Sequence, residues 1–500
     1  MNLNLKRRDF LSMLSAGAAS TALPGASASS EDKKRPNFIV IFADDLGYGD
    51  IEGFGNQQIK YQTPALKRMA SEGVKLTQVY VPVPYCAPSR ASLLTGRYPF
   101  RNGVVHNPCP DAGVNNIGLP ESEITIAEAL KPAGYATSCI GKWHLGHRRR
   151  FLPTNQGFDE YFGILYSNDM RPVQLVENET VYEYPAYQPT LTQRYTKRAL
   201  DFIQRSHDAE KPFFLYLPHA MPHKPLAASE EFYSPKTPND LYADVIRELD
   251  WSVDQVLDKV KQLGIDENTL ILFLSDNGPW YGGDSGGLRG MKAHTWDGGL
   301  RVPFIAHWPG KIPSGTVHNT PAGTIDVFPT LLKLAGVDVP ADREIDGVDI
   351  MPLLNGTNTD NPHEFLFALK GENLAMVRSG PWKLHLRSPG NPANRDDDWI
   401  DPRGPDGVTL LAQFEQSRPS EYPGTTAGVE PKSMMLFNLD KDPAETRDVS
   451  GAHPKVVERL KTYADKILSN WPKFETPDHF EGGLKRVKGG RMDFFEEYNQ

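Results

Sequence analysis

Four short apolar runs, each followed directly by polar or ionisable residues, constrain the fold of this chain more than any other feature. The runs span residues 37–42, 135–140, 213–217 and 270–274. Runs that are apolar throughout are typical of strands buried on both faces of a parallel sheet, and the amphipathic stretches between them are typical of crossover helices. From Arg35 to about residue 340, the sequence therefore predicts an α/β domain with a mixed, largely parallel central sheet.

The polar residues that follow these runs are predicted to meet at one edge of the sheet. They are Asp44, Asp45, Lys142, His144, His223, Asp276 and Asn277. Open α/β sheets gather ligands at the carboxyl ends of their parallel strands. The four strand ends therefore predict one shared site rather than four separate features.

Past about residue 362 the pattern changes to short strand-like runs at 365–369, 374–377, 382–386 and 435–439, followed by a helical pattern over 456–468. These runs predict a small antiparallel sheet covered by one helix. The stretch 388–432 is rich in Pro, Gly and Asp and predicts a surface loop. We expect a catalytic domain over residues 35–361 and a C-terminal subdomain over 362–490.

Composition argues against some partners. The net charge is −9, the pI is near 5.8, and no basic stripe is interleaved with aromatic residues, so nucleic acid is not an expected partner. No run after the N-terminal segment approaches the roughly 18 apolar residues of a membrane-spanning helix, so we expect no membrane span in the mature chain.

The first thirty residues have the composition of an export signal, with a basic start, a modest apolar stretch and small residues at Ala26–Ala28. We expect a signal peptide over residues 1–28. Arg7 and Arg8, followed by Asp9 and Phe10, resemble the twin-arginine signal, which implies the twin-arginine export machinery and a periplasmic or secreted protein. A plain secretory signal and an uncleaved lipid-side anchor are the alternatives.

Three cysteines, Cys86, Cys109 and Cys139, cannot all pair with one another. Four roles are open for Cys86: a buried packing residue, half of a disulfide, a nucleophile, or the precursor of a modified residue. Pro88 and the residues after it predict a helix that begins near position 86, where the helix dipole would favour anions and lower the pKa of a thiol. Arg90, one turn further on, can reach the same anion.

Carboxylate and amide oxygens dominate the candidate metal ligands. Asp44, Asp45, Asp276 and Asn277 supply hard oxygen donors, which favour calcium or magnesium over zinc. Either acidic pair alone could simply cap a helix or form a turn. Two adjacent acids at a buried sheet edge repel each other, however, unless a cation neutralises them.

Cationic and potentially cationic residues complete the expected site. Lys142, His144, His223 and Lys292 each have an ordinary explanation as a solvated lysine or a common histidine. Together with the acids and Arg90, they describe a site that binds a metal ion and a doubly charged anion and protonates a leaving group. Phosphate and sulfate esters are the natural substrates of such a site.

The sequence CAPSRASLLTGR at residues 86–97 resembles the C-x-P-S-R-x-x-x-L-T-G-R signature of type I sulfatases, in particular the arylsulfatase A and N-acetylgalactosamine-6-sulfatase branch. Residues 134–146 resemble the second motif of that family. Further matches lie at Asp44-Asp45, Pro222-His223, 275–278, Lys292 and 298–303. The resemblance implies an alkaline-phosphatase-like α/β sandwich with a small C-terminal antiparallel sheet.

The resemblance also implies a modified nucleophile. A maturation enzyme would oxidise Cys86 to formylglycine, present as an aldehyde hydrate, of which one hydroxyl attacks the ester sulfur and the other later releases the sulfate. Calcium, or alternatively magnesium, would be held by Asp44, Asp45, Asp276, Asn277 and residue 86. Arg90 and Lys142 would hold the hydrate, and Lys292 and Ser167 would contact the sulfate. His144 would be the base, and His223 would contact substrate and act as the acid.

The leading expectation is therefore an exported enzyme that hydrolyses sulfate esters of a sulfated carbohydrate. A phosphodiesterase or phosphonate monoester hydrolase of the same superfamily is the second hypothesis, and a calcium-dependent glycan-binding protein is the third. The basic run His147 to Arg150 would place cations near the mouth of the site, or else form an ordinary solvated surface.

Overall fold

The computed structural model describes residues 34–55, 61–109, 117–170, 173–234, 240–391 and 428–474. The expected signal peptide over 1–28 and most of the expected loop over 388–432 lie outside these ranges. The described residues from Arg35 onward belong to one compact unit. Among the helices that the structure describes, none combines the length and the hydropathy needed to cross a lipid bilayer.

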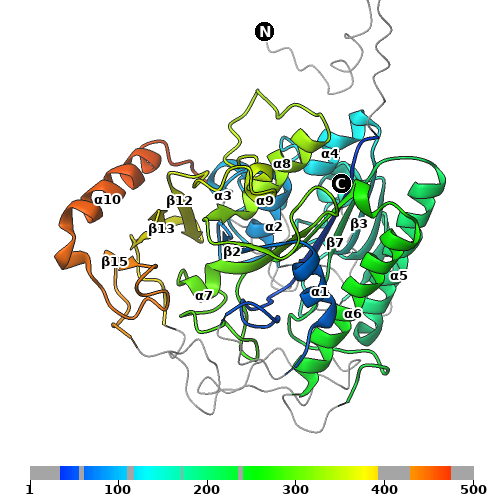
Figure 1. Ribbon diagram of the computed structural model, residues 1–500, viewed down its shortest axis with the longest axis horizontal. Coiled ribbons are helices and arrows are strands. Elements are labelled where there is room, and N and C mark those ends of the chain that lie inside the picture. The colour runs from blue at the N-terminus through cyan, green and yellow to red at the C-terminus, as the bar shows by residue number, and fades with distance from the viewer. Residues whose placement is uncertain are drawn as a thin grey trace, which may run out of the picture. The chain divides into compact units, whose positions relative to one another are not determined.

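Five neighbouring parallel strands form the centre of the large sheet (Figure 1). In spatial order they are β8 (Thr269–Ser275), β1 (Asn37–Ala43), β7 (Phe213–Pro218), β3 (Ala136–Lys142) and β4 (Glu160–Ile164). The first four correspond to the apolar runs of the sequence. The prediction that their carboxyl ends share one edge of a largely parallel sheet is confirmed.

Antiparallel pairs and short strands extend this core on both sides. Beyond β8, β9 (Arg301–His307) runs antiparallel to β8 and β2 (Val74–Tyr80), and β10 (Thr316–His318) and β11 (Ala322–Gly323) pair with β2. Beyond β4, β5 (Leu175–Glu177) and β6 (Thr180–Glu183) add two antiparallel strands. The sheet of the described residues thus has eleven strands and mixed direction.

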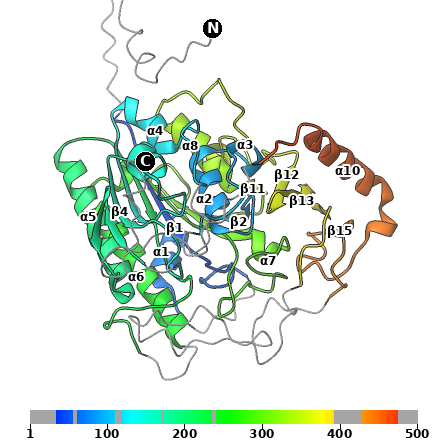
Figure 2. The same cartoon turned by 180° about the vertical axis from the view of Figure 1, so that it is seen from behind.

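Helices cover both faces of the large sheet (Figures 1 and 2). On one face lie α1 (Pro64–Glu72), α5 (Leu191–Asp208) and α6 (Asp240–Gln262), and Ile39 and Ile41 of β1 point into the core beneath them. On the other lie α2 (Cys86–Thr95), α4 (Ile126–Leu130) and α8 (Val327–Leu334), which cover Phe38 and Val40. All ten residues of α2 are buried, so its first turn lies inside the protein.

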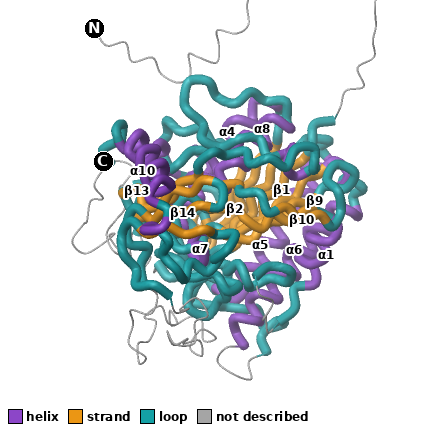
Figure 3. Tube along the Cα trace, turned by 60° about the vertical axis from the view of Figure 1, so that its left-hand side comes forward, coloured by secondary structure: helices purple, strands orange, loops and turns teal. Residues whose placement is uncertain are grey.

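Four antiparallel strands form a second, smaller sheet, in the order β12 (Leu366–Lys370), β13 (Asn373–Ser379), β14 (Trp382–His385) and β15 (Met435–Asn438). Figure 3 shows α10 (Pro454–Leu468) packed along this sheet, with Leu460 and Ala464 buried. The predicted small sheet with one covering helix is confirmed. The division into domains at residues 361 and 362 stays a prediction.

Candidate active site

Cys86 is the first residue of α2, and the extended backbone of Tyr85 (φ −143°, ψ 148°) leads into it. Its side chain is 1% exposed, and its Sγ lies 3.5 Å from Oδ1 of Asp44. The backbone N–H of Ala87 donates to Oδ1 of Asn107 at 3.0 Å. All three cysteines of the chain are free, so Cys86 is not half of a disulfide.

The expected lowering of the thiol pKa at this helix start is wrong. Burial raises the pKa of the Cys86 thiol, because the free-energy cost of removing the thiolate from water exceeds the stabilisation that the positive charges of Lys142 and Lys292 provide. Asp276 and Asp44 raise it further. The helix dipole changes the thiol pKa much less than complete desolvation does.

The two acidic pairs converge because β1 and β8 are neighbours in register, with Ala43 opposite Ser275. Asp45 has a left-handed backbone (φ 62°), and its N–H donates to Oδ1 of Asp276 at 3.1 Å. Potential ligand atoms of Asp44, Cys86 and Asp276 lie within 4.8 Å of one another, as do those of Asp45, Cys86 and His223. Burial raises the pKa of Asp44 although Lys142 opposes the shift.

The donor set fits a hard divalent cation. Asn277 donates from Nδ2 to Oδ1 of Asp45 at 2.7 Å and to the carbonyl of Gly278 at 2.9 Å. Its Oδ1 is buried and accepts no hydrogen bond from any residue that the structure describes. A buried amide oxygen without a donor, beside three buried carboxylates, is the kind of oxygen-rich surrounding that calcium or magnesium requires.

Three cationic side chains form ion pairs with the three carboxylates. Lys142 Nζ lies 2.5 Å from Oδ2 of Asp44, and Lys292 Nζ lies 2.8 Å from Oδ1 of Asp45. Arg90 donates to Oδ2 of Asp276 from Nε at 3.2 Å and from Nη2 at 2.7 Å. Its Nη1 donates to the carbonyl of Lys142 at 3.0 Å, which ties α2 to the end of β3.

The two histidines have different surroundings. His223 Nδ1 lies 2.6 Å from the carbonyl of Lys224, which leaves Nε2 facing the acids, 3.6 Å from Oδ2 of Asp45. Ser167 Oγ lies 3.2 Å from that Nε2 and 3.0 Å from Nζ of Lys142. His144 follows β3 with a left-handed backbone (φ 58°), and burial, then the nearby lysines and Arg90, lower its pKa well below its ordinary range.

All residues expected for the site lie in described parts of the chain. Hydrogen bonds and ion pairs link Asp44, Asp45, Cys86, Arg90, Lys142, Ser167, His223, Asp276, Asn277 and Lys292 into one network. His144, two residues beyond Lys142, is coupled to that network through the charges of Lys142, Arg90 and Lys292.

Two residues that the sequence did not single out support this network. Asn168 donates from Nδ2 to the carbonyls of His223 and Pro225 at 3.1 and 2.9 Å, and thus fixes the His223 loop. Asn107 holds the first turn of α2. Asn168 directly follows Ser167, which is the one sequence signal that could have identified it.

The basic run after the second motif does not act as one surface. His147 is buried against the ring of Tyr166, and burial lowers its pKa to about 3. Arg149 pairs with Glu179 at 3.2 Å, and the Arg150 guanidinium lies over the ring of Phe151 at 4.6 Å.

Known proteins share this sequence and architecture. The family model described as Sulfatase matches residues 36–337. N-acetylgalactosamine-6-sulfatase of Canis lupus familiaris is 37% identical over 466 residues, which cover 85% of this chain and 84% of that protein. Arylsulfatase A of Homo sapiens is 35% identical over 484 residues, with 89% and 90% of the two chains covered.

Solved structures agree with these relatives. The crystal structure of Ps i-CgsB superposes with a TM-score of 0.72 at 28% identity and covers 88% of this chain and 94% of that chain. PsFucS1 sulfatase from Pseudoalteromonas sp. gives 0.71 at 26% identity, with 88% and 92% covered. The expected alkaline-phosphatase-like sandwich is thereby confirmed. The chain belongs to the sulfatase family and is a sulfuric ester hydrolase.

Proposed function

We propose that this sulfatase removes sulfate from a sulfated carbohydrate, using formylglycine made from Cys86 and a divalent cation held beside it. The observation that carries the proposal is the buried cluster of three carboxylates and three cations around residue 86, joined by the Asn277 amide, whose buried oxygen accepts no hydrogen bond from any described residue. The names of several relatives support the carbohydrate substrate, since one acts on N-acetylgalactosamine 6-sulfate and Ps i-CgsB was solved with k-i-k-neocarrahexaose.

Asp44, Asp45, Asp276 and Asn277 would hold the cation, calcium or magnesium, together with the oxygen of the modified residue 86. A bound divalent cation supplies charge stabilisation to an anionic substrate and lowers the pKa of an oxygen that it holds. A formylglycine hydrate supplies two hydroxyls, one as nucleophile and one that lets the sulfate leave. A maturation enzyme would have to recognise the residues from Cys86 to Arg90 and oxidise Cys86 to formylglycine.

The chain's own residues account for binding and proton movement. Lys142 and Arg90 orient residue 86 and the Asp44 and Asp276 carboxylates, so that these groups are preorganised before substrate binds. Lys292 and Ser167 supply donors to the oxygens of the sulfate group. These contacts lie among buried groups, where electrostatic interactions are stronger than in water.

Proton movement falls to the two histidines. His223 presents Nε2 to the acids, which suits protonation of the departing alcohol. Burial, and then the positive charges of Lys142, Arg90 and Lys292, lower the pKa of His144 and favour its neutral form, and a neutral imidazole can accept a proton. We propose His223 as the acid and His144 as the base.

The modification is tested by the mass of the peptide that contains residue 86, taken from protein made in its native host. The proposal expects the mass of formylglycine and loss of turnover, with an unchanged fold, in Cys86→Ala. Fully active protein whose residue 86 is an unmodified thiol that can be alkylated would exclude this mechanism.

Substrate class is tested with a panel of defined sulfated mono- and oligosaccharides, with Cys86→Ala as the inactive control. An aryl sulfate and an aryl phosphate diester at equal concentration test the second hypothesis. The phosphonate monoester hydrolase of Agrobacterium radiobacter shares the fold at a TM-score of 0.56 and 18% identity. A large preference for the phosphate diester would overturn the proposed substrate class.

We also propose that the protein is exported through the twin-arginine route, because residues 7–10 resemble the signal for that route. In the native host, Arg7→Lys together with Arg8→Lys should retain the precursor in the cytoplasm. Unchanged export of that double variant would contradict the twin-arginine assignment.

A further inference from the structure

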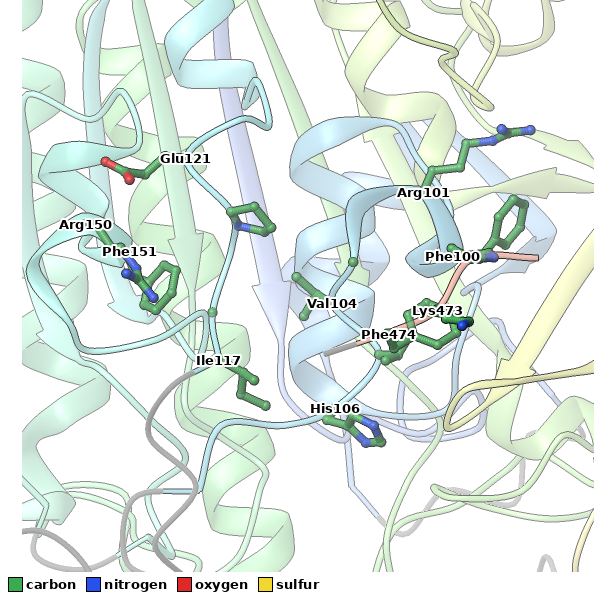
Figure 4. Close-up of a pocket in the computed structure, with 15 residues that line it drawn as sticks. Phe100, Arg101, Val104, His106, Ile117, Glu121, Arg150, Phe151, Lys473 and Phe474 are labelled. Atoms are coloured by element: carbon green, nitrogen blue, oxygen red, sulfur yellow. The ribbon is translucent and has the colours of Figure 1, made fainter. Parts of the chain in front are cut away.

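A cavity of about 480 Å³ lies outside the network described above (Figure 4). Four stretches line it: residues 100–106, 117–121, 150–151 and 472–474. Figure 4 shows Phe151 and Ile117 on one side, Val104 and Phe474 opposite them, and His106 at one end. The last stretch follows α10, so the C-terminal end of the described chain closes one wall of the cavity.

Positive charge predominates in the lining. It contains Arg101, Arg150 and Lys473, against the single acid Glu121. Arg101 already pairs with Glu344 and Asp346, each at 2.7 Å, and His106 pairs with Glu372 at 2.8 Å.

Two cations of the lining remain available to an incoming anion. Arg150 and Lys473 are exposed, and neither forms an ion pair with another described residue. The cavity therefore offers two positive charges without acidic partners.

Aromatic and aliphatic surface lies between these charges. Phe100, Ile117 and Phe474, which are partly exposed, contribute it; Val104 and Phe151 are buried, and the Arg150 guanidinium rests on the ring of Phe151. A small inorganic ion would leave this apolar surface uncovered. A sugar unit has a flat face of C–H groups that can cover aromatic rings, while a sulfate or carboxylate on its edge can reach the cations.

One residue that lines the cavity, His106, lies close in the chain to a residue that contacts the reaction site. His106 is followed by Asn107, whose side chain accepts the N–H of Ala87, next to Cys86. His106 and residue 86 are thus linked by one residue step, the Asn107 side chain and one hydrogen bond. The distance between them is therefore at most about 14 Å. An oligosaccharide whose sulfated end occupies the reaction site can extend to that distance.

We propose that this cavity binds a second anionic sugar unit of the substrate, one that carries a sulfate or a carboxylate group. The proposal rests on the proposed carbohydrate function and extends it: the enzyme recognises a chain with anions on more than one unit. Arg150 or Lys473, which lie on opposite sides of the cavity (Figure 4), binds the anion, and Ile117 and Phe474 cover the sugar face.

The test compares wild type with the double variant Arg150→Gln/Lys473→Gln. Substrates are 4-nitrophenyl sulfate and three oligosaccharides with the same sulfated end, whose inner unit is sulfated, carboxylated or neutral. In the double variant we expect KM for the sulfated or the carboxylated chain to rise roughly two- to fivefold, as loss of one exposed ionic contact implies. The oligosaccharide whose KM rises shows whether the cavity binds a sulfate or a carboxylate. KM for the neutral chain and for 4-nitrophenyl sulfate should stay at the wild-type value.

Lys211→Gln/Lys261→Gln is the matched control, because it removes two exposed lysines that precede β7 and β8, at the opposite edge of the sheet. It should leave every KM unchanged. If wild type desulfates the oligosaccharides but the cavity variant keeps the wild-type KM, or loses affinity for all substrates equally, the cavity proposal is wrong. If wild type turns over only the aryl sulfate, the proposed carbohydrate function is wrong as well.

Discussion

The Lys383 ammonium group lies 2.7 Å from the Asp297 carboxylate, and both side chains are completely buried. Glu445 joins them, since it accepts hydrogen bonds from Lys383 and from the backbone N–H of Asp297. Lys383 belongs to β14 of the small sheet, whereas Asp297 begins the short helix α7 (Asp297–Leu300), five residues after Lys292. The small sheet therefore braces the segment that brings Lys292 to Asp45.

Replacing Lys383 with methionine should destabilise the protein by about 3–5 kcal/mol, because Asp297 and Glu445 would remain buried without their shared cation. Denaturant unfolding measures this change. The turnover number should fall as well, through displacement of Lys292. Lys333→Met, which removes the exposed partner of Asp349, is the control and should leave the denaturation midpoint unchanged. Equal stability of the two variants would show that the buried network does not brace this segment.

Removing divalent metal should lower both activity and thermal stability. A ligand that binds only the folded state raises the free energy of unfolding, by about 2.7 kcal/mol at a hundredfold excess over Kd. We expect a chelator to lower the Tm of wild type and added calcium or magnesium to restore it. In Asn277→Ala the restoration should need at least tenfold more metal, whereas Asp338→Asn, which alters an exposed acid, should behave as wild type. A Tm that is indifferent to metal in wild type would contradict the proposed site.

His363 should make stability depend on pH. Burial alone would lower its pKa, but the Asp326 carboxylate at 2.8 Å outweighs this effect and raises the pKa above its usual value. Because the folded pKa is the higher one, the pair stabilises the folded state fully below pH 6.5, and this contribution is lost as the pH rises through the folded pKa.

His363→Gln should therefore destabilise the protein more at pH 5.5 than at pH 9, as measured by urea unfolding at both pH values. His207→Gln, on the last turn of α5, serves as the control and should show the same small difference at both pH values. A loss of stability in His363→Gln that does not vary with pH would mean that the histidine is neutral in the folded protein.

The central fold was predictable because burial on both faces leaves a plain signal in the sequence. Strands β1, β7 and β8 are almost continuously apolar, whereas β3, ATSCIGK, is buried but less apolar. The structure places all four within a residue or two of the predicted runs. The antiparallel strands β2 and β9 went unrecognised. Strand β2, VKLTQVY, alternates buried and half-buried residues, so its pattern is weaker than a continuous apolar run.

The site was predictable as a set of residues but not as a set of contacts. The strand ends indicated which side chains meet, whereas the pairing of Lys142 with Asp44 joins residues 98 positions apart. Lys383, Asp297 and Glu445 gave no signal, because isolated charged residues in a sequence are usually on the surface. The thiol pKa was predicted wrongly for a related reason: the helix start was visible in the sequence, but its complete burial was not.

Arg90→Lys should separate the geometry of Arg90 from its charge. The guanidinium donates twice to Asp276 and once to the carbonyl of Lys142, and a lysine in its place keeps the charge but offers a single point of contact. Each lost hydrogen bond to a charged group is worth about 1.5–3 kcal/mol, so kcat/KM should fall roughly ten- to hundredfold. The metal concentration that restores Tm after chelation should rise too, because Asp276 loses its support. Arg68→Lys, in the exposed pair with Asp254, should change neither quantity. An Arg90→Lys enzyme with wild-type kcat/KM would show that only the positive charge at position 90 is needed.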